Sequence, residues 1–493
     1  MNTKLLINGQ LIETKQKERI LNPSTGRVIE EVSLASKAEL ENALESARIA
    51  FDRGQWPRLG YDERREFILK IKQGILDNAA ELAKIETLNT GKPIKETTFM
   101  DIPSSAKSFE YMADNFEKFL SEEKISIQQE AECRLMRSAR GVAVLIIPWN
   151  YPLLIASWKL ASALCAGNTV ILKPSSLTPL SVLELARIIH DIGFPKGAVN
   201  IINAPGAEAG QLLCASKSVD MVSFTGSNEV GRQIINYTST NVKKLIMELG
   251  GKSASIIMDD VDLDVAVNSN LCSIFLNQGQ MCTAMSRILV HEKIYDKFVE
   301  TFVRKTRSIK LGQGEDFQTQ MGPLISISQI KKIITYIDKA KKEGAHVCCG
   351  GRAPEDPSLK NGFYFEPTVI TNVNAHMEVF KEEVFGPVVC IMKFSSIAEA
   401  VEIANNSDFA LAASIWTNNK EVSDEIANKI NAGIIWINTY GMFYNQAPYG
   451  GFKQSGFGKE LGREGFLEYT GLKNVIVDRN PQGKPLVNYW YGF

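Results

Sequence analysis

Residues 142–174 have the sequence VAVLIIPWNYPLLIASWKLASALCAGNTVILKP. Short apolar runs at 142–148 and 169–174 enclose a longer apolar stretch, which a Gly-Asn pair separates from the second run. This order of strand, helix and strand is typical of a parallel sheet covered on both faces. Lys159 lies in the middle of the stretch and argues against a membrane span. The segment therefore predicts buried α/β core.

The same texture extends toward the C-terminus. Further apolar runs lie at 198–204, 221–226, 243–251, 287–290, 388–394 and 433–438. They fall into two series, the second of which starts near Ser253, and they predict two α/β domains.

The N-terminal part has helical periodicity instead. Residues 36–51 predict an amphipathic helix that begins with Ser36 and Glu39 as a capping box, and helical pattern continues to about residue 119. Residues 122–140 then alternate like exposed strands. We expect this strand-like segment and the C-terminal tail to form an arm in an oligomer contact.

Length and composition limit the class of protein. A chain of 493 residues exceeds one domain, and 44% hydrophobic with 23% charged residues is the balance of a folded globular protein. A net charge of −1 without a long basic run argues against nucleic acid as a partner. The first residues lack the apolar core of a signal peptide, so we expect a cytoplasmic protein with reduced thiols.

The eight cysteines have no CxxC spacing and the four histidines are far apart, so no metal site is predicted. Cys282 stands in the polar stretch NQGQMCTAMSR, whereas Cys165, Cys272 and Cys390 lie in apolar runs. Cys282 is therefore the best candidate nucleophile of the eight, although a thiol that only packs is the competing interpretation.

Several polar residues follow predicted strands, where open α/β sheets present ligands. Gly226, Ser227 and Gly231 come after the strand MVSFT, and they predict either a phosphate site at a helix start or an ordinary strand–helix turn. Glu248 ends an apolar strand just before two glycines. It is either a partly desolvated general base or an acid that caps the loop. Asn150 ends another strand, where its amide can donate to an oxyanion.

Together these segments resemble the NAD(P)-dependent aldehyde dehydrogenase family. Seven motifs occur in the family's order over nearly the whole chain: PWNYP, KPS, FTGSNEVG, ELGGK, NQGQMC, EEVFGP and PYGGFKQSGFGKELG. The resemblance implies an α/β fold with two Rossmann-related parallel-sheet domains and a small β oligomerisation arm. It places the cofactor-binding domain at 1–120 and 141–250, the catalytic domain at 251–465, and the arm at 121–140 and 466–493.

The resemblance also implies roles for single residues. Cys282 corresponds to the nucleophile, Glu248 to the general base and Asn150 to an oxyanion donor. The cofactor, NAD or NADP, is expected to contact Pro148, Trp149, Lys173, Ser175, Ser176, Gly206, Gly210, Phe224, Thr225, Gly226, Ser227, Gly231, Leu249, Gly250, Glu383 and Phe385. The aldehyde is expected to contact Tyr151, Trp158, Leu276, Met281, Thr283 and Tyr449.

The implied chemistry needs no histidine. A Cys282 thiolate attacks the aldehyde, and the Asn150 amide and the Cys282 backbone N–H hold the oxyanion. After hydride transfer, water that is deprotonated by Glu248 cleaves the thioester and releases a carboxylic acid. The resemblance further implies a homodimer or homotetramer.

Two positions depart from the family pattern. Ser176 stands where the family commonly has a glutamate that binds the adenosine ribose, so the preference between NAD and NADP stays open. Tyr151, Trp158 and Tyr449 match aromatic positions of the betaine-aldehyde branch, in which such rings hold a cationic ammonium. Leu276 replaces an aromatic residue often found there, so a cationic amino-aldehyde and a neutral aldehyde are both open.

Two other classes of function compete with a dehydrogenase. A cysteine hydrolase or acyltransferase would use Cys282 without redox chemistry, but it lacks an evident histidine partner and leaves FTGS and EEVFGP without a purpose. A catalytically silent structural homologue conflicts with the intact Cys282, Glu248 and Asn150.

Overall fold

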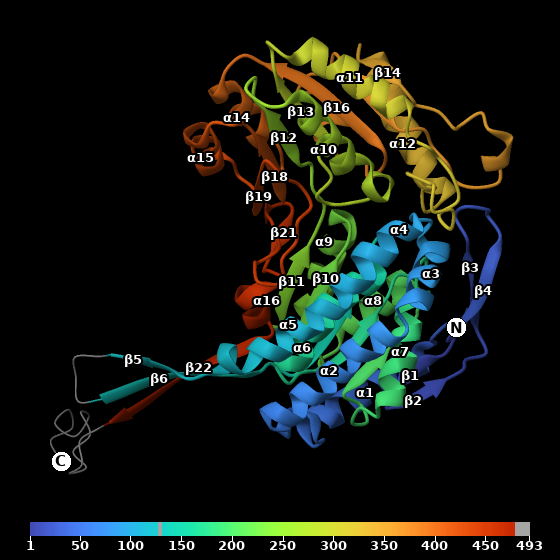
Figure 1. The fold of residues 1–493 in the computed structure, drawn as a ribbon. Helices are drawn as coiled ribbons and strands as arrows, with labels where there is room; N and C mark the ends of the chain where they lie inside the picture. The colour runs from blue at the N-terminus through green and yellow to red at the C-terminus, as the bar shows by residue number, and fades with distance from the viewer. Residues whose placement is uncertain (127–130, 479–493) are drawn as a thin grey trace.

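The computed structural model describes residues 1–126 and 131–478 and confirms the α/β class. Figure 1 shows two bodies, each built on a sheet, and an arm that extends away from the first body. The N-terminal half of the chain forms most of the first body, and residues after about 250 form most of the second. The predicted arrangement of two α/β units is therefore confirmed.

The first sheet has the order β2-β1-β9-β8-β7-β10-β11-β21. Its strands are β1 (Leu5–Ile7), β2 (Gln10–Ile12), β7 (Val142–Ile146), β8 (Thr169–Lys173), β9 (Val199–Ile201), β10 (Met221–Thr225), β11 (Lys244–Glu248) and β21 (Gly456–Phe457). The five central strands are parallel, and the outer strands pair antiparallel. The apolar runs predicted between 142 and 251 thus all become neighbouring strands.

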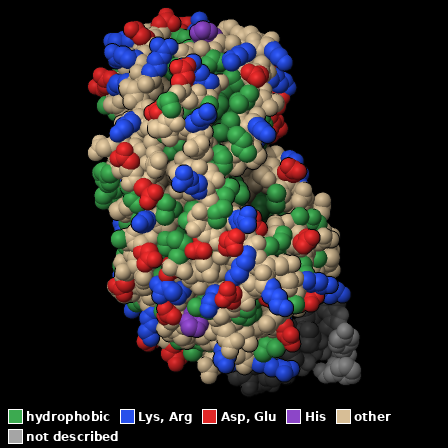
Figure 2. Space-filling model, turned by 90° about the vertical axis from the view of Figure 1, so that its right-hand side faces the viewer, with side chains coloured by type: hydrophobic (Ala, Val, Ile, Leu, Met, Phe, Trp, Pro, Cys, Tyr) green, Lys and Arg blue, Asp and Glu red, His purple; other side chains and the backbone are tan. Residues whose placement is uncertain are grey.

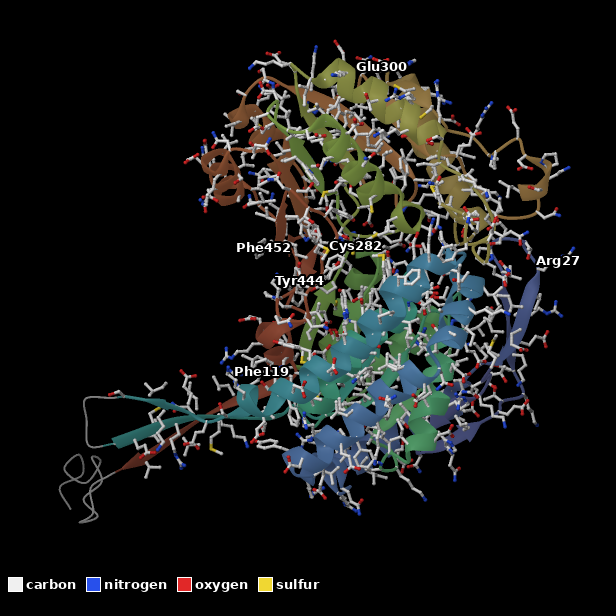
Figure 3. All side chains as sticks on the ribbon, in the orientation of Figure 1. Arg27, Phe119, Cys282, Glu300, Tyr444 and Phe452 are labelled. Carbon is white, nitrogen blue, oxygen red and sulfur yellow. The ribbon has the colours of Figure 1, made fainter. Side chains whose placement is uncertain are left out.

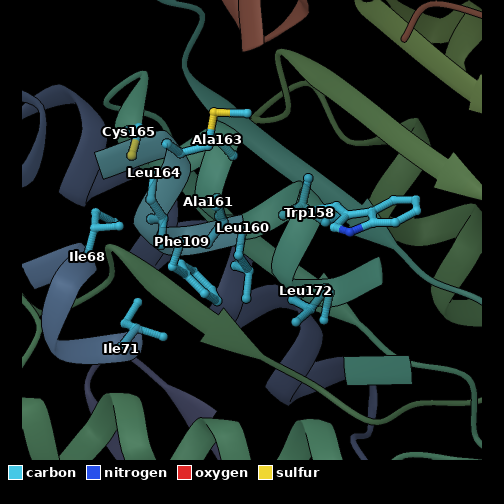
Figure 4. Packing of buried hydrophobic residues seen from close by; sticks show 14 of the residues in the cluster. Ile68, Ile71, Phe109, Trp158, Leu160, Ala161, Ala163, Leu164, Cys165 and Leu172 are labelled. Atoms are coloured by element: carbon cyan, nitrogen blue, oxygen red, sulfur yellow. The ribbon is translucent and has the colours of Figure 1, made fainter. Parts of the chain in front are cut away.

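Helices cover both faces of this sheet. They are α1 (Lys37–Asp52), α2 (Tyr61–Asp77), α3 (Ala79–Thr90), α4 (Ile94–Glu96), α5 (Ile102–Leu120), α6 (Pro152–Cys165), α7 (Leu180–Ile192), α8 (Gly206–Ala215) and α9 (Asn228–Tyr237). Alternate residues of β7 point to opposite faces, so Ala143 and Leu145 pack with α5 and α6 while Val142 and Val144 pack with α1 and α8. Figure 4 shows the first of these clusters, with Phe109 of α5 against Leu160 of α6.

The predicted N-terminal helix is confirmed. α1 begins after Ser36, whose hydroxyl accepts from the Ala38 N–H, and Glu39 accepts from the Ser36 N–H to complete the capping box. The Gly-Asn break is confirmed as well, because α6 ends just before it and β8 follows directly.

The second sheet has the order β14-β15-β16-β13-β12-β18-β19. Its strands are β12 (Ala254–Ile257), β13 (Arg287–His291), β14 (His346–Cys349), β15 (Thr368–Thr371), β16 (Val388–Phe394), β18 (Ala412–Trp416) and β19 (Ile434–Ile437). Its helices are α10 (Leu263–Phe275), α11 (Tyr295–Arg307), α12 (Ile327–Lys342), α13 (Glu378–Lys381), α14 (Ile397–Asn405) and α15 (Lys420–Lys429). Strands β14, β15 and β18 were not among the predicted runs.

The chain returns from the second body to the first near its end. β21 pairs with β11, and α16 (Gly462–Glu468) packs against α5 and α6. Leu461 and Phe466 belong to the core of the first body. The predicted domain boundaries stay predictions. The strand β21 comes from the predicted catalytic segment 251–465, yet it pairs at the edge of the first sheet.

The arm is a three-stranded antiparallel sheet of β5 (Glu123–Ile125), β6 (Ala131–Ala139) and β22 (Thr470–Asp478), in the order β22-β6-β5. Register runs from Thr470 opposite Ala139 to Asp478 opposite Ala131. The segment after 120 and the C-terminal tail thus pair within one chain in the described residues, and the expected oligomer contact stays a prediction. Residues 127–130 and 479–493 of the predicted arm lie outside the described residues.

Smaller elements complete the fold. The remaining strands are β3 (Lys17–Leu21), β4 (Val28–Ser33), β17 (Phe409–Ala410) and β20 (Phe452–Lys453), and the short helical turns are η1 (Trp56–Arg58), η2 (Thr97–Asp101), η3 (Thr238–Thr240), η4 (Leu276–Gly279) and η5 (Pro357–Leu359). Within 1–126 and 131–478, none of the helices combines the length and apolar character needed to cross a membrane. Figure 2 shows acidic and basic side chains intermixed on one face.

Candidate active site

A cavity of about 1020 Å³ lies where the two bodies meet. In Figure 3 Cys282 is at this junction, between the strands of the first body and those of the second. The ends of β7, β8, β10 and β11 form one wall, as expected for the carboxyl edge of a parallel sheet. Every predicted site residue lines this cavity except Gly210 and Gly231.

Those two glycines lie elsewhere. Gly231 is inside α9, and a Cβ there would come within 2.7 Å of Leu249 Cδ2. It therefore allows the helix to pack closely on the strand end. Gly210 is inside α8, where a Cβ would meet no atom within 4 Å. The structure gives neither glycine a place in the cavity.

The loop before Cys282 has an unusual backbone. Asn277 and Gln278 have φ angles of 47° and 57°, in the left-handed region that side chains disfavour. Hydrogen bonds hold this turn: the Asn277 backbone N–H donates to Glu96 Oε2 at 3.2 Å, and its side-chain amide donates to the Asn150 carbonyl at 3.2 Å. The position of Cys282 is thus fixed by contacts with distant segments.

The Cys282 thiol has one side-chain hydrogen-bond partner in the described parts of the chain: its Sγ lies 2.9 Å from Tyr449 Oη. Burial raises the pKa of Cys282 to about 12, and the hydrogen bond with Tyr449 opposes that rise. The negative charges of Glu383 and Glu248 contribute to the same rise in pKa. The resting thiol is therefore largely protonated at neutral pH.

The other cysteines differ from the expectation at one position. Cys165 and Cys390 are buried, as expected for residues in apolar runs. Cys272 is exposed on α10, because the apolar run around it forms a helix with one outward face. Cys272 lies outside the cavity.

Glu248 ends β11 and is only 2% exposed. Neither carboxylate oxygen has a hydrogen-bond partner among the described residues. Burial raises the pKa of Glu248 well above its usual value, and the nearby Glu460 carboxylate adds to this effect. A partner-free carboxyl with a raised pKa is suited to accept a proton near neutral pH.

Asn150 follows β7 and is 5% exposed. Its Nδ2 donates to the Gln280 carbonyl at 2.8 Å, which holds the amide plane beside the Cys282 loop. An amide nitrogen carries two N–H groups, so the second remains free to donate. The Asn150 side chain can therefore serve as an oxyanion donor in the cavity it lines.

The part of the cavity near β8 and α9 suits an anionic ligand. Ser227 caps α9, and the free N–H groups of its first turn carry a partial positive charge. Lys173 ends β8 and is 4% exposed, and burial lowers its pKa to about 8. Among residues 1–126 and 131–478, its ammonium donates only to the Pro174 carbonyl, at 3.2 Å, so it keeps donors for a ribose or a phosphate.

Glu383 and Phe385 come from the loop before β16. The Gly251 N–H donates to Glu383 Oε1 at 2.9 Å, and burial raises the pKa of this carboxyl to about 7. Phe385 has a φ of 58° and its ring packs edge-on against Trp149, at 5.3 Å between centroids. The strained backbone turns the ring into the cavity, where it can contact a flat ligand.

Aromatic rings form the other part of the cavity. The Trp158 ring lies 5.1 Å from that of Tyr449, and the Phe443 ring lies 5.6 Å from that of Tyr449. Tyr151 and Leu276 line the same space. Phe443 was not predicted, because its segment GMFYNQ carries no motif and only the fold turns it inward.

The sequence analysis also missed two buried ionic clusters, each of which contributes one carboxylate, Glu460 or Asp101, to the lining of the cavity. Lys159 donates to Glu460 Oε1 at 2.6 Å and to Ser223 Oγ at 2.7 Å. Lys92 pairs with Asp101 and lies 4.0 Å from the centroid of the Tyr151 ring. The first cluster had one signal in the sequence, which is Lys159 inside an apolar helix. In the sequence analysis this lysine served only as an argument against a membrane span.

Comparisons with known proteins agree with this geometry. The profile described as the aldehyde dehydrogenase family matches residues 11–475. Betaine aldehyde dehydrogenase of Bacillus subtilis (strain 168) is 42% identical over 98% of both chains, and retinaldehyde dehydrogenase 3 of Mus musculus is 40% identical over 97% of this chain and 94% of its own. A crystal structure of Staphylococcus aureus betaine aldehyde dehydrogenase with NAD+ has a TM-score of 0.96 and 40% identity, covering 99% of this chain and 96% of its own.

Proposed function

Because the chain belongs to the aldehyde dehydrogenase family, we propose how its own residues divide the work of oxidising an aldehyde with NAD+ or NADP+. The protein is an NAD(P)-dependent oxidoreductase that converts an aldehyde to a carboxylic acid. The roles proposed below rest on one observation: a single cavity brings together Cys282, Glu248 and Asn150.

The cavity fits a dinucleotide next to an aldehyde. Its volume is at the upper end of ligand sites, and its donors at Lys173 and at the start of α9 match a ribose and a pyrophosphate. Glu383 offers a carboxylate for ribose hydroxyls, and Phe385 a ring face for a flat base. When the cofactor is bound, its nicotinamide ring accepts the hydride.

Cys282 forms the covalent intermediate in this proposal. Its thiolate attacks the carbonyl carbon, a C–S bond forms, and the carbonyl oxygen becomes an oxyanion. The free N–H of the Asn150 amide and the Cys282 backbone N–H donate to that oxygen. Loss of hydride then converts the adduct to a thioester.

Glu248 resolves the thioester in this proposal. Its carboxylate takes a proton from water, the hydroxide adds to the thioester carbon, and the C–S bond breaks to release the acid and the Cys282 thiolate. Neither carboxylate oxygen has a hydrogen-bond partner in the described part of the chain, so both can bind that water.

We propose that the substrate carries a compact cationic head group. The rings of Tyr151, Trp158, Phe443 and Tyr449 line the cavity beside Cys282, and a quaternary ammonium gains about 0.5–2 kcal/mol on such faces. The likeness to a betaine aldehyde dehydrogenase supports the same class. A matched pair of substrates tests it: trimethylammonioacetaldehyde and its neutral isostere 3,3-dimethylbutanal. We expect a kcat/KM at least about fivefold higher for the cation, equivalent to ~1 kcal/mol, and equal values contradict the proposal.

We also propose that the protein is a cytoplasmic homodimer or homotetramer. All eight cysteines are free, as is usual in a reducing compartment. The arm presents Leu472 and Ile476 at 54% and 66% exposure, and such apolar strand surface is a common contact between copies. A monomer in light scattering at micromolar concentration contradicts the oligomer.

Replacement of the nucleophile tests the proposed chemistry as a whole. We expect Cys282→Ala to abolish formation of reduced cofactor while cofactor binding persists, because no other thiol lies in the cavity. Cys272→Ala is the matched control on an exposed thiol and retains activity. Turnover by the Cys282→Ala protein above a trace would remove Cys282 from the nucleophile role.

A further inference from the structure

The Tyr449 hydroxyl is held against the reactive sulfur by its surroundings. The ring packs between Trp158 and Phe443, with centroids 5.1 Å and 5.6 Å away. Its backbone N–H donates to the Glu460 carbonyl at 2.7 Å, and the Glu460 N–H donates back at 2.8 Å. With ring and backbone both fixed, the distance of 2.9 Å between Tyr449 Oη and Cys282 Sγ is set by the fold.

The sulfur stands in a site that otherwise disfavours its charge. Burial and the carboxylates of Glu383 and Glu248 all raise the pKa of Cys282. The opposing interactions are hydrogen bonds, one from Tyr449 and one from the Cys282 backbone N–H. A tyrosine hydroxyl with a pKa well above 10 keeps its proton, so it can only donate to a thiolate.

We propose that Tyr449 is a catalytic residue whose hydroxyl donates a hydrogen bond to the Cys282 thiolate and so raises the fraction of reactive sulfur. This inference rests on the proposed nucleophile role of Cys282. The thiol proton leaves to solvent in the cavity, Tyr449 retains its own proton, and the sulfur lone pair forms the C–S bond with the aldehyde. As its negative charge moves to the carbonyl oxygen, the sulfur becomes a weaker acceptor for the hydroxyl.

The sequence analysis places Tyr449 in the aldehyde pocket alone, and an aromatic ring without a hydroxyl is sufficient for that contact. Phenylalanine offers the same ring without the oxygen, so Tyr449→Phe separates the two roles. The contacts of the ring with Trp158 and Phe443 are kept in this variant.

Alkylation of the protein by iodoacetamide, without aldehyde or cofactor, measures the reactive sulfur directly. The rate is followed at Cys282 by mass spectrometry of its peptide from pH 7 to 10. Loss of one hydrogen bond to a thiolate raises the pKa by about one unit, so the thiolate fraction falls about tenfold. The more basic thiolate is about threefold more nucleophilic, which leaves an expected fall of about three- to fourfold in rate at each pH.

Tyr444→Phe is the matched control, because it removes a phenol oxygen from the same loop at a ring that is 57% exposed. We expect its alkylation rate to equal that of the parent, and the thermal midpoints of both variants to stay within a few degrees. An unchanged alkylation rate in Tyr449→Phe overturns the proposal, even if turnover falls, because the residue then acts only on substrate fit. Turnover by Cys282→Ala would instead refute the nucleophile assignment, so the two failures are distinguishable.

Discussion

Two buried glutamates line the same cavity, one held in a polar network and the other without hydrogen-bond partners among the described residues. Glu460 is 1% exposed and accepts from Lys159, Ser223 and Tyr469, at 2.6, 3.0 and 3.3 Å. Glu248 is 2% exposed and its oxygens have no hydrogen-bond partner among the described residues. Glu460 and Glu248 are therefore equally buried, and they differ in the number of their hydrogen-bond partners.

The buried lysines repeat this contrast. Lys159 has a carboxylate and a hydroxyl as partners, whereas Lys173, within the part of the chain that the structure describes, donates only to the carbonyl of the next residue. A buried charge with satisfied partners stabilises one arrangement of the fold, and a buried charge without them costs stability unless a ligand uses it. Missing partners, more than burial, distinguish Glu248 and Lys173 from Glu460 and Lys159.

The largest expected effect is that of replacing Glu248, the glutamate without hydrogen-bond partners among the described residues. We expect Glu248→Gln to lower steady-state turnover by about 10²- to 10⁴-fold, the usual contribution of a general base. A single burst of reduced cofactor should remain, because the base acts after hydride transfer. Stopped-flow absorbance of the reduced cofactor separates the burst from the steady rate, and an undiminished steady rate excludes Glu248 as the base.

The same residue predicts a pH dependence. A protonated carboxyl accepts no proton, and burial raises the pKa of Glu248 well above its usual value. The steady rate of the parent should therefore rise with pH through the neutral range and above, instead of reaching its plateau near pH 5. A rate that is flat from pH 6 to 9 contradicts this expectation.

The pair of Lys159 and Glu460, which have hydrogen-bond partners, is tested by measuring the free energy of unfolding. Lys159→Met leaves Glu460 buried without its cation, which costs about 3–5 kcal/mol. Lys17→Met breaks an ion pair with Glu13 at the surface and should cost less than about 1 kcal/mol. Thermal unfolding compares the two variants. A double replacement of Lys159 and Glu460 by Met should recover most of the loss, and equal midpoints for both single variants would contradict the contrast.

The Asn150 amide is partly satisfied. One of its N–H groups donates to the Gln280 carbonyl, and the other has no acceptor among the described residues. We expect Asn150→Ala to lower kcat by roughly 10²- to 10³-fold, as for other single oxyanion donors. Steady-state kinetics at saturating aldehyde measures the effect. A loss below about tenfold would leave Asn150 with a structural role in holding the loop.

The smallest effect concerns the cofactor. Ser176 lines the cavity near Lys173, and a glutamate there would repel the 2′-phosphate of NADP+ and accept from the ribose hydroxyls of NAD+. We expect the parent to accept NADP+ and Ser176→Glu to shift preference toward NAD+ by about tenfold, or ~1.4 kcal/mol. Values of kcat/KM with both cofactors measure the shift, and an unchanged ratio shows that Ser176 does not determine the preference.

Much of this protein follows from local sequence. The strands between 142 and 251 and the capped helix α1 were predicted because alternation, helical period and capping depend on residues a few positions apart. Cys282, Glu248 and Asn150 were singled out because each follows or interrupts such a pattern in a polar context. Asn150 and Glu248 meet because parallel strands share a carboxyl edge, whereas Cys282 comes from the loop before β13 and is positioned by tertiary contacts.

Tertiary structure decided the partners. Lys159 and Glu460 are 301 positions apart, and Cys282 and Tyr449 are 167 apart. No periodicity extends over such separations, because contacts of this kind form only when β21 and the segment before it fold back onto the first sheet. The sequence by itself determined the central strands of the first sheet, the helix α1, the family and the three candidate catalytic residues. The fold determined which buried charges are neutralised and which remain free to react, because that depends on the atoms that surround them in space.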